Sequence, residues 1–356
     1  MPEAITHPPL TTLSEEEELF RRTVRDFAER AVRPRVAAME QAGSLDRGLL
    51  AQCFELGLMG IEIPETYGGA GGNMLMTVLA VEELSAVDAS LAIFVDVQNT
   101  LVNALLIKWA SDEIRSRYLP RLATDLLGAY ALSEPESGSD AFGLQTRASR
   151  AGDKWILEGR KLWITNGAEA GLFVIFANSD FTKGYKGITA FAVERGCKGL
   201  SVGKKEDKLG IRASSTCELL LEECQVPRAN VLGEPGKGYK VAIETLNEGR
   251  IGIGAQMVGL AQGALDAARM LTWSAAAKGK DVSLAHASMA KLAATTAAQA
   301  AVTRATQVVG VDSFRRGHVI ERLTQDVRAI ELFAGRTEAL RESVAVDQLP
   351  AVSSPN

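Results

Sequence analysis

The chain has 356 residues, 46% hydrophobic and 23% charged, a mix typical of a globular protein with a sizeable core. Its formal net charge of −5 argues against a nucleic-acid groove or a polybasic membrane patch. No uncharged run reaches membrane-spanning length, and residues 1–20 are acidic without an apolar signal core, so we expect a cytoplasmic protein that does not contact a membrane. The four cysteines form no CxxC pair and the three histidines are scattered, which argues against a disulfide framework or a metal site.

Residues 13–125 predict a helical domain. Ser14 and Glu17 have the spacing of a capping box, and the apolar residues that follow recur at helical intervals. Further helices are expected over 47–58, 74–109 and 111–125, with a glycine-rich loop at 63–73.

Residues 128–233 predict a β domain, because β-branched and aromatic residues gather in short runs that glycines interrupt. Strands are expected over 154–165, 172–178, 187–194 and 215–223, and residues 151–153 predict a hairpin turn.

The sequence becomes helical again from Gly236, where an apolar stripe begins, and Ala-rich helices follow to about residue 345. The stripe consists of Ile243, Leu246, Ile253, Met257 and Leu260. The predicted fold is therefore α+β and multidomain: an N-terminal helical domain (1–126), a β-barrel domain (127–235), a C-terminal helical bundle (236–345) and a disordered tail (346–356).

Two segments carry side chains suited to a planar, polar ligand. Residues 129–148 are rich in small and hydroxyl residues, whose backbone N–H groups can bind an anion or a heteroaromatic edge; the alternative is a polar connection between domains. At the end of the strand 154–165, Trp163 and Thr165 offer a flat apolar face and a donor, unless the indole is a core residue.

Arg250 interrupts the apolar stripe of the C-terminal helix. A buried guanidinium needs an anionic partner, which is either an internal carboxylate such as Glu83 or Glu244 or a bound phosphate or thioester-bearing ligand. The glycines at 249, 252 and 254 cost helix stability and are best tolerated where a backbone or ligand approaches closely. No G-x-G-x-x-G fingerprint or P-loop occurs in the chain.

Four segments together resemble the acyl-CoA dehydrogenase family, in particular its short/branched-chain members. They are ALSEPESGSD (131–140), WITN (163–166), the run from Asp207 to Tyr239, and LNEGRIGIGAQ (246–256). The resemblance extends from about residue 14 to 345 and is strong through residue 263.

This resemblance implies that FAD binds between the β domain and the C-terminal helices. By matching motif positions, the resemblance implies that Tyr130, Leu132 and Ser133 lie at the flavin pyrimidine edge, and that Trp163, Ile164 and Thr165 lie beside the ring. It also implies that Gln307 and Gly310 contact the FAD of a neighbouring subunit. It puts Ser139 at the cofactor and the acyl-thioester chain, and Asn247 and Arg250 at the pantetheine and phosphate end. In the family, a glutamate removes the α-proton while a hydride leaves the β-carbon for the flavin.

The chain departs from the family at the base. The usual position holds Ala334, which cannot accept a proton, and the earlier position that some members use holds Gly249. Glu248, one residue away, is the candidate base, and Glu331 and Glu338 are further carboxylates near the usual position.

The C-terminal bundle also lacks a segment that the family has. We expect a shortened helical hairpin that turns near Gly263; the alternative is one helix to about Ala277. In the family, a loop with the pattern Gln-x-x-Gly-Gly-x-Gly contacts the FAD of the neighbouring subunit. This chain has only Gln307 and Gly310 of that pattern.

The predicted function is an FAD-dependent oxidoreductase that acts on the CH–CH group of a short or branched acyl thioester, with a non-standard or missing base. The alternatives are an inactive, flavin-poor subunit that pairs with a complete paralogue, and a reduced-flavin monooxygenase on the same scaffold. The expected partners are an acyl-CoA or acyl-carrier-protein substrate, an electron-transferring flavoprotein, and further copies of the chain in a dimer or tetramer.

Overall fold

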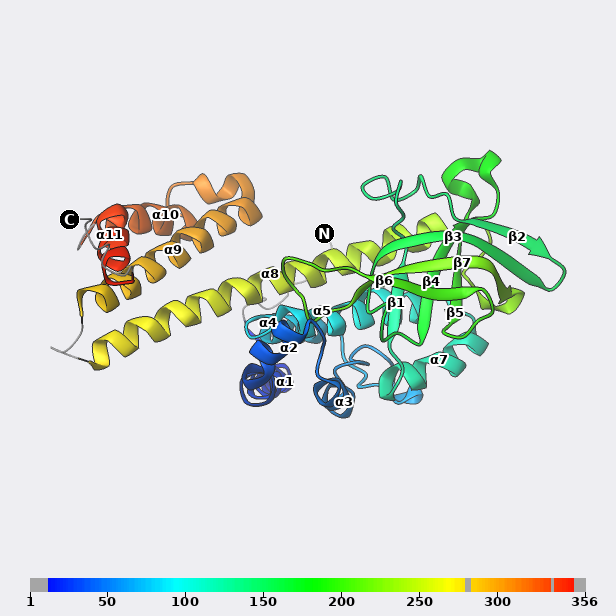
Figure 1. Ribbon diagram of the computed structural model, residues 1–356, viewed down its shortest axis with the longest axis horizontal. Coiled ribbons are helices and arrows are strands. Elements are labelled where there is room, and N and C mark those ends of the chain that lie inside the picture. Colours follow the sequence, from blue (N-terminus) through cyan, green and yellow to red (C-terminus); the bar gives the residue numbers. More distant parts are fainter. Residues whose placement is uncertain (1–11, 279–282, 334–335, 349–356) are drawn as a thin grey trace, which may run out of the picture. The chain divides into compact units, whose positions relative to one another are not determined.

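The computed structural model describes residues 12–278, 283–333 and 336–348. The chain forms two compact units, unit 1 (Met1–Gly259) and unit 2 (Leu260–Asn356). Unit 1 contains the N-terminal helices, the β domain and the first part of a long helix, and unit 2 contains the remaining helices (Figure 1).

The N-terminal part of unit 1 is helical, and its helices begin at capping residues. The predicted capping box is confirmed, because the Glu17 N–H donates to the Ser14 hydroxyl (3.2 Å) and the Ser14 N–H donates to the Glu17 carboxylate (2.8 Å). Asp88 caps a later helix and so divides the expected helix 74–109. The helices are α1 (Glu15–Phe27), α2 (Val36–Ala42), α3 (Arg47–Glu55), α4 (Met74–Ser85), α5 (Ala89–Asp96), α6 (Ala104–Trp109) and α7 (Asp112–Thr124), with the π-helical turns η1 (Ala28–Val32) and η4 (Val97–Asn103) and the 3₁₀ turns η2 (Arg33–Arg35) and η3 (Glu65–Tyr67).

The stretch Ala89–Trp109 is long and apolar enough, by length and composition, to cross a membrane. However, 78% of its most apolar window is buried inside the protein, as in a core helix. Asp96 interrupts its apolar run, so the sequence contains no uncharged run of that length.

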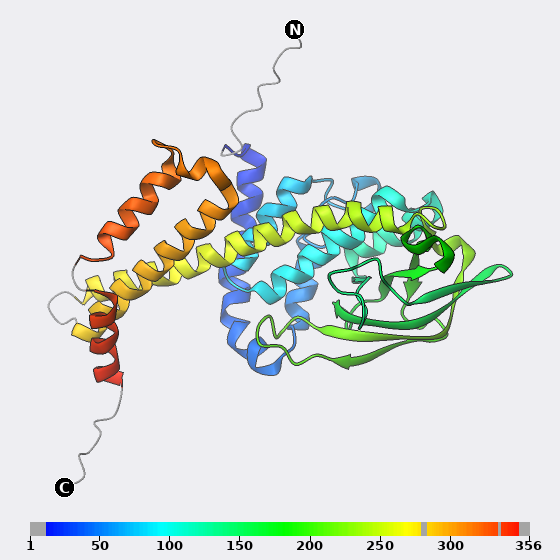
Figure 2. The ribbon, with the colours of Figure 1, turned by 90° about the horizontal axis from the view of Figure 1, so that it is seen from above.

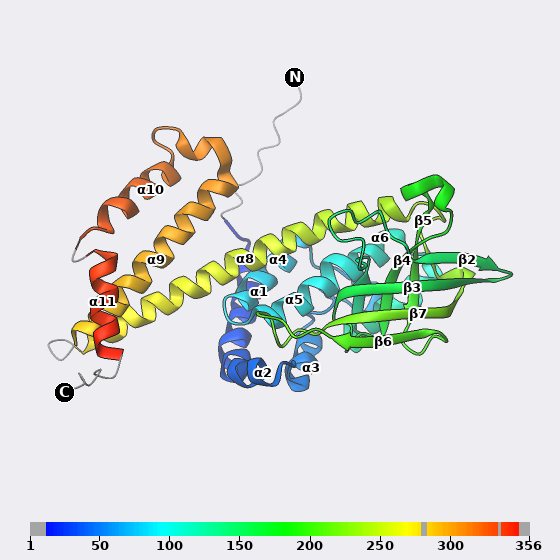
Figure 3. The same ribbon diagram turned by 45° about the horizontal axis from the view of Figure 1, so that its top comes forward.

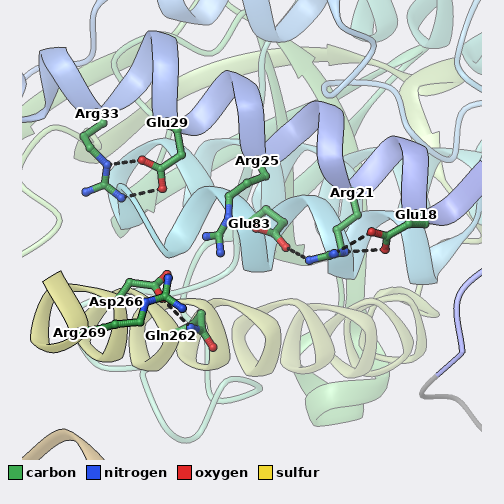
Figure 4. Close-up of polar contacts among 9 residues, drawn as sticks. All are labelled: Glu18, Arg21, Arg25, Glu29, Arg33, Glu83, Gln262, Asp266 and Arg269. Atoms are coloured by element: carbon green, nitrogen blue, oxygen red, sulfur yellow. Dashed lines mark hydrogen bonds and ion pairs between the residues drawn. The ribbon is translucent and has the colours of Figure 1, made fainter. Parts of the chain in front are cut away.

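Ion pairs join α1 to α4 (Figure 4). The buried carboxylate of Glu83 on α4 pairs with Arg21 (2.9 Å) and Arg25 (3.1 Å) of α1. Arg21 also pairs with Glu18 at 2.9 Å. Glu83 therefore has its cationic partners on α1, and it is not the partner that Arg250 was expected to need.

The β domain is one eight-stranded sheet with the order β6-β7-β3-β2-β4-β5-β8, and β1 pairs with β4 (Figure 3). β3 and β4 have the predicted bounds, and the predicted turn at 151–153 joins β2 to β3 as an antiparallel pair, with Gly152 at φ +62°. The strands are β1 (Gly128–Ala131), β2 (Arg147–Ala151), β3 (Lys154–Thr165), β4 (Leu172–Asn178), β5 (Ile188–Glu194), β6 (Leu200–Lys205), β7 (Thr216–Pro227) and β8 (Val231–Leu232), with the 3₁₀ turns η5 (Phe181–Gly187) and η6 (Arg228–Asn230).

The helix that follows the sheet, α8 (Gly238–Ala277), is continuous over 40 residues. The predicted hairpin near Gly263 is therefore wrong, and the alternative of one helix to about Ala277 is right. The residues after Gly263 are mainly Ala, Leu, Arg and Met, and one glycine costs a helix only about 1 kcal/mol, which does not end it.

Within unit 1, small residues of α8 lie against η4, α5 and α4 (Figure 2). A Cβ added at Gly252 would collide with the Asp96 carboxylate, and one at Gly259 would collide with the Glu82 carbonyl. Four of the five residues of the predicted apolar stripe are exposed instead: Ile243, Ile253, Met257 and Leu260. The fifth, Leu246, packs against the core. The predicted close approach is thus confirmed at Gly252 and at Gly249, which lies against Leu101, but not at Gly254, where an added Cβ would meet nothing within 4 Å.

Unit 2 consists of the end of α8 with α9 (Leu284–Val309), the 3₁₀ turn η8 (Gly310–Phe314), α10 (Val319–Ile330) and α11 (Thr337–Gln348). On α8, Asp266 contacts Gln262 and Arg269 (Figure 4). α11 extends three residues past the predicted end of the bundle, and the rest of the predicted tail, 349–356, lies outside the described residues.

Candidate functional site

A cavity of about 180 Å³ lies in unit 1 where the sheet meets the helices. Five of the predicted flavin residues line it together, although they come from two separate sequence segments. These are Tyr130, Leu132, Ser133, Trp163 and Thr165. The hydrogen bond from the Leu162 N–H to the Ser133 carbonyl (3.0 Å) holds the two segments side by side.

The opposite wall of the cavity is helical and apolar. Val97 and Leu101 of η4 and Leu246 of α8 supply it. The sequence analysis did not identify Val97 or Leu101, because they lie more than 25 residues before the ALSEPESGSD motif. The cavity therefore joins a polar sheet edge to an apolar helical wall.

Trp163 has an unusual backbone conformation. Its φ is +61°, a region that costs a non-glycine residue energy and is often found at functional sites. The pairing of β3 with β7 shifts register between Lys161 and Ile164, and the indole is 60% exposed. The alternative that Trp163 is a core residue is thus wrong.

Tyr130 brings an unsatisfied polar group to the cavity. Its ring packs against Phe176 at 5.0 Å, and burial raises the pKa of its phenol well above the usual range. Among the described residues, none bonds to its buried hydroxyl. A buried hydroxyl without a partner costs free energy, which a ligand with polar edge atoms can recover.

A buried ion pair supports the segment that carries Ser133. Lys161 Nζ donates to the Glu134 carboxylate (2.6 Å) and to the Leu132 carbonyl (3.1 Å), and both charged side chains are almost inaccessible to water. The Glu134 carboxylate also accepts the N–H groups of Gln145 and Thr146. Burial opposes ionisation of Glu134, but Lys161 and these donors keep its pKa below the ordinary value, and burial lowers the pKa of Lys161 to about 8. Sequence analysis missed this pair because its members are 27 residues apart and no local pattern links them.

A second buried carboxyl lies behind the helical wall. Asp96 is 1% exposed and accepts a hydrogen bond from the Thr100 hydroxyl at 3.2 Å. Burial raises its pKa to about 7, with Thr100 opposing the shift. Asp96 does not line the cavity, and its side chain lies beside Gly252 of α8.

Asp96→Asn should stabilise unit 1 at pH 8 by about 2 kcal/mol. The folded state holds the Asp96 proton more tightly than the unfolded state, so wild-type stability is highest below the unfolded pKa and falls as the pH rises toward about 7. Raising the Asp96 pKa from 3.8 to about 7 corresponds to about 4 kcal/mol, and we expect about half of that because a buried amide N–H₂ without an acceptor costs free energy. Urea unfolding at pH 5 and pH 8 measures this; an equal pH slope in both proteins would contradict it.

Several predicted residues lie away from the cavity lining. Ser139 is exposed in the loop after β1, and the Ile164 side chain is buried in the core of the sheet. Asn247 and Arg250 are exposed neighbours on α8, where Arg250 Nη1 donates to the Asn247 amide oxygen (2.5 Å). The expectation of a buried Arg250 is therefore wrong, because the residues of α8 that pack inward are the small ones.

Glu248 does not line the cavity either. It is two residues from Leu246, which turns it about 200° around the helix. Burial raises the pKa of Glu248. The positive charge of Lys108 opposes this increase, and the negative charge of Glu244 adds to it. Glu244 pairs with Lys108 (2.8 Å), so it is not a partner of Arg250.

The remaining predicted residues belong to unit 2. Gln307 is exposed at the end of α9, where its amide oxygen accepts a hydrogen bond from Arg304. Gly310 ends α9 with φ +70°, a conformation that favours glycine. Glu338 is exposed and Glu331 pairs with Arg328, whereas Ala334 lies outside the described residues.

The sequence matches a known family along most of its length. Residues 14–125, residues 129–224 and the two overlapping stretches 236–283 and 263–349 match the N-terminal, middle and C-terminal domains of acyl-CoA dehydrogenases. A probable short/branched chain specific acyl-CoA dehydrogenase of Dictyostelium discoideum is 44% identical over 375 residues, covering 95% of this chain and 91% of that relative. The alignment is longer than the 356-residue chain, so the relative has residues that this chain lacks.

Solved structures agree with this assignment. Butyryl-CoA dehydrogenase from Megasphaera elsdenii is 32% identical, with a TM-score of 0.71 over 95% of this chain and 99% of that one. A glutaryl-CoA dehydrogenase from Mycobacterium smegmatis, solved in complex with FADH2, is 27% identical, with a TM-score of 0.70 over 96% and 97%. The chain belongs to the acyl-CoA dehydrogenase family of FAD-dependent oxidoreductases.

Proposed function

We propose that the cavity of unit 1 receives the flavin ring of FAD and that the chain oxidises the CH–CH group of a short or branched acyl thioester. The observation that carries this proposal is the convergence of Trp163, Ser133, Thr165 and the unpartnered Tyr130 hydroxyl on one cavity. A flat indole face, two hydroxyls and an orphaned buried hydroxyl suit a planar ring with polar atoms along one edge.

In this proposal each residue has a defined task. Trp163 stacks beside the ring, Ser133 and Tyr130 bond to its polar edge, and the apolar wall of Val97, Leu101 and Leu246 excludes water. FAD, when bound, accepts the hydride that the substrate gives up. The ion pair of Lys161 and Glu134 keeps the Leu132–Ser133 backbone in place.

The proposed chemistry has a non-standard or missing base. Among the residues that the structure describes, no carboxylate lines the cavity. A thioester α-proton is weakly acidic, and a positioned base typically contributes about 10²- to 10⁴-fold to its removal. Glu248 is a candidate base by sequence only, because its place on α8 gives it no direct access to the cavity.

The acyl carrier and partners are also proposals. Arg250 is exposed on α8 and, within the described part of the chain, has no carboxylate within ion-pair distance, so it can meet the phosphate of CoA or of a carrier-protein arm. Ser139 and Asn247 would contact the acyl and pantetheine parts. We further propose an electron-transferring flavoprotein as oxidant, a homo-oligomer in which Gln307 and Gly310 approach a neighbour's FAD, and a cytoplasmic location.

An absorption spectrum of the purified protein tests the proposal. We expect a flavin band after incubation with FAD, and turnover of short or branched acyl-CoAs with an artificial electron acceptor. A colourless protein that cannot take up FAD would overturn it. The same colourless result would favour the second candidate, an inactive, flavin-poor partner subunit. A coloured protein without turnover would instead mean that the chain binds FAD but lacks the base, in keeping with a cavity that no carboxylate of the described residues lines.

Trp163→Gly should weaken FAD binding about tenfold or more and change the free energy of unfolding by less than about 1 kcal/mol. Glycine accepts the positive φ at this position, so the loss of strain offsets the lost contacts of a mostly exposed indole. Flavin fluorescence titration and urea unfolding measure the two effects. Trp273→Ala is the matched control, because Trp273 is also 60% exposed and does not line the cavity; equal loss of affinity in both variants would contradict the assignment.

A further inference from the structure

Two of the four cysteines lie together at one end of the β domain. Cys197 is in the turn between β5 and β6, and Cys224 is on β7. Their sulfur atoms are 3.7 Å apart, and the Cys197 thiol also donates to the Gln225 carbonyl at 3.0 Å. The other cysteines, Cys53 and Cys217, are buried and have no second sulfur in contact among the described residues.

Backbone hydrogen bonds hold the two segments together beside the cysteines. The Glu222 N–H donates to the Gly199 carbonyl (2.8 Å) and the Gln225 N–H donates to the Lys198 carbonyl (3.0 Å). A disulfide has a sulfur–sulfur length of about 2.05 Å, so the sulfurs need to approach by roughly 1.7 Å, which side-chain rotation can supply without separating the strands.

The two thiols differ in access and in acidity. Cys197 is half-buried and can be reached by a small solute, whereas Cys224 is fully buried in the core of the sheet. The hydrogen bond with Cys224 lowers the pKa of Cys197 to about 7, with burial opposing the shift, and the same contact raises the pKa of Cys224. This combination resembles an accessible attacking thiol beside a resolving thiol.

We propose that Cys197 and Cys224 are a thiol-oxidation site that forms a reversible disulfide on contact with a hydroperoxide. The Cys197 sulfur attacks one oxygen of the hydroperoxide, the O–O bond breaks, and the other oxygen leaves as an alcohol or water after taking a proton. The Cys224 sulfur then attacks the sulfenic sulfur of Cys197, and the hydroxyl leaves as water with the Cys224 proton. The two thiols lose two electrons, and the peroxide oxygens are reduced.

The disulfide would close a loop that contains β6, the segment between β6 and β7, and most of β7. It is remote from the flavin residues along β7, because Thr165 pairs with Thr216 and Leu157 pairs with Cys224. We therefore expect oxidation to raise the melting temperature by about 5 °C, through the restriction of the unfolded chain, and to leave FAD affinity unchanged.

The test treats the full-length protein with hydrogen peroxide and counts free thiols after denaturation. We expect a fall from four thiols to two, a Cys197–Cys224 peptide in the digest, and recovery of four thiols with dithiothreitol. Cys197→Ser should keep its three thiols under the same treatment, and Cys53→Ser should still lose two. Because Cys197 is half-buried, its serine variant should fold, and Cys224→Ala is a second variant that should give Cys197 oxidation without a crosslink.

Three results would overturn the proposal. They are four thiols that remain after peroxide treatment, a disulfide that involves Cys53 or Cys217, and a Cys197 that gains oxygen in the wild-type protein without forming the crosslink.

Discussion

Lys161→Met should destabilise unit 1 by about 3–5 kcal/mol and weaken FAD binding at least tenfold. The change removes the cation from a pair in which the Glu134 side chain is 3% exposed, and a carboxylate left buried without its partner carries most of its desolvation cost. The Leu132 carbonyl also loses its bond from Nζ, so the backbone beside Ser133 is less firmly placed. Urea unfolding and a flavin titration of the folded protein measure the two losses.

The neighbouring residue supplies the matched control. Arg160 pairs with Glu218, and the two side chains are 55% and 11% exposed, against 0% and 3% for Lys161 and Glu134. Because water reaches the cation, Arg160→Met should cost clearly less than Lys161→Met, about 1 kcal/mol. A double variant, Lys161→Met with Glu134→Gln, removes both charges and keeps an oxygen acceptor for the N–H groups of Gln145 and Thr146. It should recover part of the stability without recovering FAD affinity. Equal losses for Lys161→Met and Arg160→Met would show that the buried pair does not have the role assigned to it.

The parts of the fold that the sequence predicted correctly depend on local signals. Ser14 and Glu17 form the capping box because both hydrogen bonds lie within one turn of helix. β3 and β4 have their predicted bounds because β-branched and aromatic residues fill them and glycines or polar turns flank them. In the site, Ser133 and Trp163 were found because their motifs are contiguous in the sequence.

The errors arise where the prediction went beyond local preference to the packing of distant segments. α8 was expected to turn at Gly263 from the up-down order of a bundle, whereas the local preference of the residues around it is helical throughout. Arg250 was expected to be buried because it interrupts an apolar stripe, but Gly252 and Gly259 form the inward face and carry no hydropathy signal. The pairing of Lys161 with Glu134 needs the folded sheet, so no sequence pattern could reveal it.

The composition of the cavity leads to a gain-of-function prediction at Gly249. This residue is three positions after the cavity-lining Leu246, and a Cβ added to it would lie 2.7 Å from Cδ2 of Leu101, which lines the same cavity. A leucine terminus can move aside, so a side chain at 249 can reach the cavity wall. Glutamate also suits a helix better than glycine, by about 0.5–1 kcal/mol.

Gly249→Glu should therefore raise the rate of acyl-CoA dehydrogenation about 10²- to 10⁴-fold, the contribution of a positioned base. The assay follows an artificial electron acceptor across short and branched acyl-CoAs, with bound FAD quantified in each variant. Glu248→Gln should leave the wild-type rate within about twofold, because residue 248 lies about 200° around α8 from Leu246. If Glu248→Gln instead abolished turnover, Glu248 would be the base, and the interpretation that the wild-type cavity lacks a base would be wrong.

Gly254→Glu is the matched control for Gly249→Glu, because it distinguishes the effect of the new carboxylate's position from the effect of its charge. A Cβ at Gly254 meets nothing within 4 Å, so a glutamate there adds the same charge and helix preference to α8 without approaching Leu101. We expect no rate increase from it. An increase confined to Gly249→Glu would mean that the cavity can already align a thioester with the flavin and lacks only a proton acceptor, whereas FAD-loaded Gly249→Glu without any increase would mean that the substrate does not reach this wall.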